Sequence, residues 1–197
     1  FKEGIRTYIK SYSNSNSDWN GLVSILDQKT DLNLRKWSDV WVNSTGRPLF
    51  SEQITYDENQ IIRKFDLLQQ AEDGTTKIWP QTFDVELVYA DHIQKISVLS
   101  NSKSVELTKA IGLKKPETIL YNSNGFGYGV FPSNEKNLEL SFTLKNEVSK
   151  AHIYLNSYEN VILGKINGLD TYQSFLKGIK IESNEIILGL LIKQTLA

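Results

Sequence analysis

The heptapeptide FDVELVY, residues 83–89, sets the periodicity of the central part of this chain. Its apolar side chains fall at every second position, and the acidic side chains of Asp84 and Glu86 lie between them. A period of two is typical of a β-strand with one buried face. The heptapeptide therefore predicts a strand whose apolar positions face a core.

Short runs of the same kind recur between Pro48 and about Asn134, with polar turns between them. ISVL, SVEL and TILY are examples, and ITYDENQIIRKFDL indicates two strands that flank an Asp-Glu-Asn turn. We count about seven or eight such strands, a number typical of an antiparallel sandwich. Residues 48–134 are therefore expected to form a β-sandwich domain.

The first 47 residues carry a helical period instead. In FKEGIRTYIKSY, at the start of the chain, apolar side chains recur every three or four positions, which predicts an amphipathic helix. Ser17 or Asp18 is expected to cap a second helix, and the Thr30-Asp31 pair a third. Gly46 then ends the helical segment.

From residue 135 onward the period is again helical. One long helix carries an apolar stripe of the kind that faces a core, and Gly164 ends it. The stripe comprises Leu144, Val148, Ala151, Leu155, Tyr158 and Ile162. Asp170 is expected to cap a short helix, and Ser183 or Asn184 the final one. The predicted fold class is therefore α+β: a helical segment at 1–47, a sandwich at 48–134, and the first helices of a C-terminal helical domain at 135–197.

Composition excludes several classes of function. The chain has 197 residues, a formal net charge of −1, no cysteine and no methionine. Without cysteine there is no disulfide, thiolate zinc site or thiol catalysis. A nucleic-acid-binding domain usually has a basic surplus, and the longest apolar run, IILGLLI, is far shorter than the ~20 residues of a membrane helix. We therefore expect no nucleic-acid or membrane partner, and a soluble protein of the cytoplasm or the periplasm.

The stretch GFGYG, residues 125–129, holds three of the twelve glycines. A dinucleotide-binding loop requires G-x-G-x-x-G at the start of a helix. Here the spacing is G-x-G-x-G, and VFPSNEKN follows, with a proline and no phosphate-binding lysine. Glycines beside aromatic residues in a strand context indicate a turn or close backbone packing. We interpret GFGYG as a structural turn.

The side chains that could perform catalysis are scattered along the sequence. His92 and His152 are the only histidines, and no H-E-x-x-H or G-x-S-x-G motif is present. Each histidine is expected at a surface or a domain boundary. A pair of glycosidase carboxylates stays open, because it depends on separation in space. We predict no catalytic, metal-binding or cofactor-binding residue in this chain. The tryptophans Trp19, Trp37, Trp41 and Trp79 are interpreted as core residues rather than a ligand platform.

Both ends of the chain run through apolar helices without stop signals. No cap precedes Phe1, and NEIILGLLIKQTLA has no terminating Gly or Asn. We expect a fragment of a longer protein. Phe1, Ile5 and the Ile186–Ile192 face should then form an exposed apolar patch through which the chain self-associates.

The opening segment resembles the aminopeptidase N-like zinc metallopeptidases, also called gluzincins. That family has an F-x-x-G-[LI]-R-x-Y-[LI]-K helix, then W-x-x-x-W and G-x-P, at the end of its thermolysin-like catalytic domain. The matching positions here are Phe1, Gly4, Ile5, Arg6, Tyr8, Ile9 and Lys10, then Trp37, Trp41, Gly46 and Pro48.

Later parts of the chain are similar to the same family in their order. NSNGFGYGVF resembles its N-x-x-G-x-[GY]-Y turn at Asn122, Gly125 and Tyr128. The segment NEVSKAHIYLNSYENVILGKI resembles a D-x-x-x-[RK]-A helix element at Lys150 and Ala151, with Asn146 or Glu147 near the acidic position. The resemblance thus extends, by order of elements, over the whole chain.

The resemblance implies a non-catalytic C-terminal portion of a zinc aminopeptidase, which removes N-terminal residues from peptides. The family's zinc ligands, its G-x-M-E-N motif and its transition-state tyrosine all lie upstream of the matching segment, so no catalytic residue is assigned to this chain. Zinc would belong to the parent enzyme. The implied partners are the parent's catalytic domain, which this chain would brace, and the peptide substrates whose cavity it would help to wall.

Two alternatives stay open. A scaffold or interaction module with the same architecture but no peptidase activity would lack the zinc motif upstream. An unrelated carbohydrate-binding sandwich would require a solvent-facing Trp79.

Overall fold

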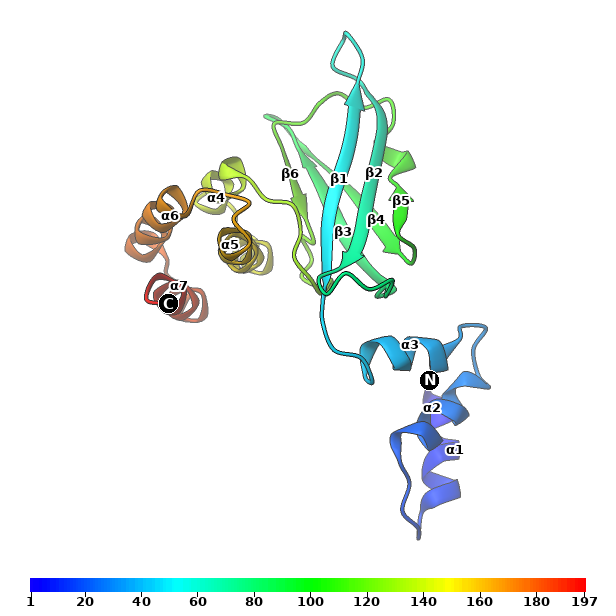
Figure 1. The fold of residues 1–197 in the computed structure, drawn as a ribbon. Helices are drawn as coiled ribbons and strands as arrows, with labels where there is room; N and C mark the ends of the chain where they lie inside the picture. Colours follow the sequence, from blue (N-terminus) through cyan, green and yellow to red (C-terminus); the bar gives the residue numbers. More distant parts are fainter. The chain divides into compact units, whose positions relative to one another are not determined.

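A computed structural model describes residues 1–197 as a mixed α+β protein with seven α-helices and two three-stranded sheets (Figure 1). The chain divides into two compact units, Phe1–Gly46 and Arg47–Ala197. All six strands and the four C-terminal helices belong to the second unit. The predicted α+β class is therefore confirmed.

The first unit contains three helices, α1 (Lys2–Tyr12), α2 (Trp19–Asp27) and α3 (Leu34–Trp41). Asp18 caps α2, as one of the two predicted candidates, and its carboxylate accepts from the Gly21 N–H at 2.8 Å. The predicted Thr30-Asp31 cap of α3 is wrong. Asn33 caps this helix, because its side-chain oxygen lies within 2.8 Å of the Lys36 N–H, the distance that a capping bond requires.

The apolar residues that were expected to form one patch differ in exposure. Phe1 is 87% exposed and Ile186 is 84% exposed. On the helix that contains Ile186, however, Ile187 and Leu191 are buried. The Ile186–Ile192 segment therefore has one face inside the second unit and one face outside it.

The second unit begins with strands β1 (Pro48–Tyr56), β2 (Ile62–Ala71), β3 (Gln81–Val88), β4 (Ile93–Ser100), β5 (Ser104–Glu106) and β6 (Thr118–Tyr121). They form two antiparallel sheets with the orders β1-β2-β5 and β4-β3-β6. The structure therefore has six strands, fewer than the seven or eight that we expected. The chain after β5 forms a short 3₁₀-helix, Thr108–Ala110, and Val130 makes only an isolated bridge to Leu49.

One hydrophobic core lies between the two sheets, since residues from β1 and β2 pack there with residues from β3, β4 and β6. Phe83, Val85 and Leu87 are fully buried in it, which confirms the inward face predicted from FDVELVY. The predicted turn between the first two strands is also confirmed, because the Asp57 carboxylate accepts from the Asn59 and Ile61 N–H groups.

Four helices follow the strands, α4 (Glu135–Ser141), α5 (Glu147–Ile162), α6 (Gly168–Ile181) and α7 (Glu185–Thr195). Asn184 caps α7 as predicted, but Asn167, rather than Asp170, caps α6. Leu120 points from β6 into a second core, whereas its neighbours Ile119 and Tyr121 belong to the core between the sheets. Strand β6 therefore has a core on each side. The second core comprises Leu120, Leu138, Ile153, Tyr154, Phe175, Ile187 and Leu191.

The predicted orientation of α5 is wrong in part, since Leu144, Ala151 and Tyr158 of the stripe pack against the second core but the other three do not. Three residues of the apolar stripe, Val148, Leu155 and Ile162, are exposed, by 53%, 47% and 59% respectively. The buried residues of this helix are Ser149, Ile153, Tyr154, Asn156, Ser157 and Asn160. Small polar side chains face inward because they pair with backbone groups of the segment after β6, as described below.

None of the helices combines the length and the apolar character that a membrane span requires.

Candidate functional site

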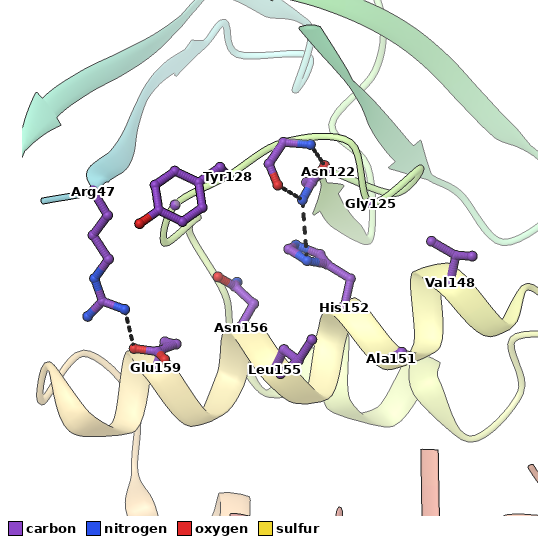
Figure 2. A pocket seen from close by; sticks show the side chains of 12 residues that line it. Arg47, Asn122, Gly125, Tyr128, Val148, Ala151, His152, Leu155, Asn156 and Glu159 are labelled. Carbon is purple, nitrogen blue, oxygen red and sulfur yellow. Dashed lines mark hydrogen bonds and ion pairs between the residues drawn. The ribbon is translucent and has the colours of Figure 1, made fainter. Parts of the chain in front are cut away.

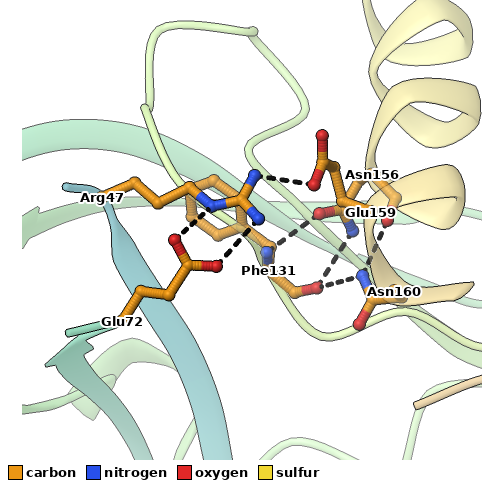
Figure 3. Close-up of polar contacts among 6 residues, drawn as sticks. All are labelled: Arg47, Glu72, Phe131, Asn156, Glu159 and Asn160. Atoms are coloured by element: carbon orange, nitrogen blue, oxygen red, sulfur yellow. Dashed lines mark hydrogen bonds and ion pairs between the residues drawn. The ribbon is translucent and has the colours of Figure 1, made fainter. Parts of the chain in front are cut away.

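Helix α5 is joined to the segment after β6 by hydrogen bonds between its side chains and the backbone of that segment (Figure 3). Asn156 accepts from the Phe131 N–H at 2.9 Å and donates to the Phe131 carbonyl at 3.0 Å. Asn160 donates to the same carbonyl at 2.9 Å, and Ser149 donates to the Ser123 carbonyl at 2.7 Å. We call this set of contacts the junction. It satisfies backbone groups that would otherwise be buried without partners.

Arg47 adds a charged contact at the edge of the junction (Figure 3). Its guanidinium donates two hydrogen bonds to Glu72, at 3.0 and 2.9 Å, and one to Glu159 of α5, at 2.6 Å. The hydrogen bond to Glu72, and then that to Glu159, raise the pKa of Arg47, although partial burial opposes the shift. Arg47 is the first residue of the second unit. Its two ion pairs therefore connect the start of this unit to the turn after β2, through Glu72, and to α5, through Glu159.

The GFGYG stretch forms a closed loop after β6. Asn122, with φ of 53°, donates to the Gly127 carbonyl at 3.0 Å and accepts from the Gly127 N–H at 2.7 Å. Gly125 and Gly129 also have positive φ, 70° and 127°. The next helix begins only at Glu135. The interpretation of GFGYG as a turn with close backbone packing is confirmed.

A cavity of about 550 Å³ lies between this loop and α5, a size within the usual range for small-molecule pockets. Its wall is mainly apolar, from the loop glycines and from Val148, Ala151 and Leu155. Figure 2 shows the Asn122 and His152 side chains in direct contact where the loop meets α5, at the wall of this cavity. The Arg47–Glu159 ion pair supplies charge at one end. This junction cavity is the candidate site because apolar surface and a few oriented polar groups converge there.

His152 is the one histidine of the junction cavity. Its Nδ1 lies 3.4 Å from the Asn122 side-chain nitrogen, which is a donor, so Nδ1 accepts and the proton is on Nε2. Nε2 is buried without a partner, and the ring packs edge-on against Phe131 at 5.6 Å between centroids. Burial lowers the pKa of His152 to about 4. The imidazole is therefore neutral and poorly suited to accept a proton at neutral pH.

The stability of the protein should depend on His152 in acid. The unfolded state binds a proton on this residue below a pKa of about 6.5, but the folded state binds it only near pH 4, so stability is complete above 6.5 and falls as the pH drops. Between pH 7.5 and 4.5 the expected loss from this group is about 2.5 kcal/mol.

The measurement is urea unfolding at both pH values for the wild type, for His152→Gln and for His92→Gln. The wild-type loss on acidification should shrink in the first variant and persist in the second, because His92 is exposed. Equal pH dependence in all three proteins would contradict the burial of His152.

The other residues considered at the sequence level lie apart from this cavity. His92 is exposed beside Asp91, with Nδ1 and the carboxylate 2.7 Å apart, and stacks on Tyr89. His152, by contrast, lines the junction cavity, and its ring packs against Phe131 within the second unit rather than at the surface or at a boundary between units. No three side chains of His, Asp or Glu lie close enough together to hold a metal ion.

The tryptophans fit the core interpretation only in part. Trp79 is 2% exposed, which removes the solvent-facing aromatic that the carbohydrate-binding alternative required. Trp19 and Trp37 are 42% and 40% exposed, because the small first unit leaves part of each ring uncovered. Trp19 nevertheless donates to the Ser38 hydroxyl at 2.6 Å, and Trp37 stacks on Trp41.

Sequence reasoning missed the residues that build the junction. Ser149, Asn156 and Asn160 lie on one face of α5, and none carries a charge. A solvated helix face normally carries Lys or Glu, so a row of small uncharged polar residues was the available signal. Asn122 carried a weaker one, since Asn is among the few residues that tolerate positive φ.

A search against models of known protein families finds no match to this chain, and no curated protein matches it either.

Proposed function

We propose that this chain is the supporting, non-catalytic part of an aminopeptidase N-like zinc peptidase. Residues 1–47 would be the tail of the catalytic domain, 48–134 its β-sandwich domain, and 135–197 the first helices of its C-terminal domain. The chain would brace the catalytic domain and help to wall the cavity that receives peptides.

The motif order of the opening 48 residues is the observation that carries this proposal. Three features of the structure support a bracing role. Strand β1 begins at Pro48, the last residue of the G-x-P motif, and two packed sheets and four helices follow. Arg47 ties the start of the second unit to Glu72 and Glu159. The junction holds helices and strands in one compact unit, as a brace requires.

The residues of this chain do not fit a zinc site. The two histidines have separate surroundings, and no His, Asp or Glu trio is clustered. A catalytic zinc usually has three protein ligands and one open position. Zinc-assisted hydrolysis would therefore be supplied by the remainder of the parent enzyme, and no catalytic step is assigned to this chain.

The purified chain should neither hold stoichiometric zinc nor hydrolyse aminoacyl p-nitroanilides. Zinc content by plasma mass spectrometry and turnover over a panel of such substrates are the two measurements. His92→Ala/His152→Ala is the matched control, and it should change neither result. Stoichiometric zinc together with turnover in the wild type, lost in the double variant, would refute the supporting role.

A scaffold without peptidase activity is the second candidate, and the exposed apolar residues Val148, Leu155 and Ile162 of α5 favour it, because such surface suits a protein partner. The coding sequence upstream of Phe1 discriminates the two. An H-E-x-x-H motif with a downstream glutamate supports the peptidase, whereas an upstream domain of the same family that lacks this motif supports the scaffold.

A further inference from the structure

A second cavity, of about 170 Å³, lies between the edge strands β1 and β6, away from the junction cavity. Alternation along β1 places Glu52 on the same face as Phe50, Ile54 and Tyr56. Phe50 belongs to the core between the sheets, and Ile54 and Tyr56 pack against that core. Glu52 is therefore a carboxylate on the inward face of an edge strand.

The Glu52 carboxylate has no hydrogen-bond or ion-pair partner. Burial of the carboxyl group raises its pKa to about 6. Since the residue as a whole is exposed, water screens this charge in part. The same carboxylate contributes to the raised pKa of Tyr56, after burial of the phenol itself. Glu52 thus carries a negative charge that forms no ion pair within the chain, although Lys115 lines the same cavity.

Tyr121 faces the same cavity from β6. It shares the inward face of that strand with Ile119, and its ring packs edge-on against Phe65. The residue is 3% exposed, and its hydroxyl is buried without a hydrogen-bond partner. A buried hydroxyl without a partner is costly, so native structures rarely retain one without a reason.

We propose that this cavity binds a primary ammonium group, with the Glu52 carboxylate and the Tyr121 hydroxyl as its acceptors. An ammonium supplies a positive charge for the unpaired carboxylate and an N–H donor for each of the two acceptors, and its third N–H can face water. The ring of Tyr56 adds a face suited to a cation, and Lys115 Nζ already lies 5.3 Å from its centre at the cavity wall.

The size of the cavity and its surroundings restrict the ligand. A volume of about 170 Å³ admits an alkylammonium head but not a peptide-sized ligand. The other titratable groups of the wall are Lys115 and Glu117, whose charges are opposite. The ammonium can come from a free small amine or from a lysine side chain of a polypeptide.

A purely structural role for Glu52 would have a different signature. Inward-pointing charges on edge strands prevent sheets of different molecules from joining. In that case Glu52→Gln would increase aggregation, while amines would bind no better to the wild type than to the variant.

The experiment titrates ethylammonium chloride and Nα-acetyl-lysine methylamide into the full chain, and follows the ¹³C signals of the Glu52 carboxyl group and the Tyr121 ring by NMR. We expect saturable binding that strengthens from pH 5 to pH 7, because burial raises the pKa of the Glu52 carboxyl group and its ionised fraction therefore still rises over this range. Equal affinity for the two probes would indicate a free amine, and tighter binding of the lysine derivative a polypeptide lysine.

Two variants and one control make the test specific. Glu52→Gln should weaken binding at least tenfold and abolish its pH dependence, and Tyr121→Phe should weaken it about fivefold. The control is Glu58→Gln, which removes one negative charge from the exposed β1–β2 turn. Its affinity for the amines should stay within about twofold of the wild-type value. In the ligand-free protein, Tyr121→Phe should not lower the urea midpoint, since the hydroxyl has no partner to lose.

The proposal is overturned if neither amine saturates the Glu52 and Tyr121 signals. It is also overturned if Glu52→Gln and Glu58→Gln have the same affinity, or if Tyr121→Phe destabilises the free chain, because the hydroxyl would then have an internal partner. These outcomes do not depend on the relation to zinc peptidases.

Discussion

Asn156→Ala should destabilise the second unit by about 3 kcal/mol, while Leu155→Ala, at the adjacent position of α5, should cost less than about 1 kcal/mol. Asn156 pairs with both backbone groups of Phe131, and its removal leaves the buried Phe131 N–H without an acceptor. The Phe131 carbonyl keeps its bond from Asn160. Leu155 is 47% exposed, so its truncation leaves no closed cavity in a core.

Urea unfolding measures this difference, with the NMR amide signals of Phe131 and Val85 as reporters of the second unit. Asn156→Asp is the matched control, since it keeps an acceptor for the Phe131 N–H but loses the donor to the carbonyl. If Leu155→Ala were the more damaging change, the apolar stripe would be the buried face of α5, and the orientation described here would be wrong.

Gly129→Ala should also destabilise the second unit by about 3 kcal/mol or more. The backbone of Gly129 has φ of 127°, a conformation that L-residues rarely adopt. A Cβ at this position would lie 2.5 Å from the Pro48 carbonyl oxygen. That oxygen accepts from the Val130 N–H at 3.0 Å, so moving it away would break the bridge between β1 and the loop. The destabilisation expected for Gly129→Ala is therefore the sum of a contribution from backbone strain and one from steric overlap.

Gly74→Ala separates these two contributions. Gly74 has φ of 74° but no atom within 4 Å of the position of a Cβ, so only strain remains and the expected cost is about 1 kcal/mol. The free energy of unfolding of both variants can be compared by the same urea experiment. Similar values for the two would show that the loop can move away from Pro48, and that close packing does not explain this glycine.

Sequence periodicity predicted most of the elements, because it reports on contacts between near neighbours in the chain. The inward face of Phe83, Val85 and Leu87 followed from a period of two, and the β1–β2 hairpin from its Asp-Glu-Asn turn. The caps at Asp18 and Asn184 were among the candidates named. The cap errors at Asn33 and Asn167 were shifts of a few residues, in segments where several polar residues could perform the same role.

The orientation of α5 and both cavities could not be predicted in this way. A stripe of apolar residues shows that a helix has an apolar face, but it does not identify the surface that the helix meets. Here that surface includes the backbone of Phe131 and Ser123, which needs hydrogen bonds more than it needs apolar contact. Glu52 and Tyr121 likewise belong to one cavity because two sheets pack face to face, and they are 69 positions apart in the chain.

Local spacing along the chain was thus sufficient for the α+β class, for the turn at GFGYG and for most helix and strand positions, since each depends on residues within about one or two turns of one another. Which faces are buried, and which polar groups are left without partners, depended on contacts between distant segments. Burial is a property of the packed molecule, and the same side chain is stabilising or costly according to what packing places beside it.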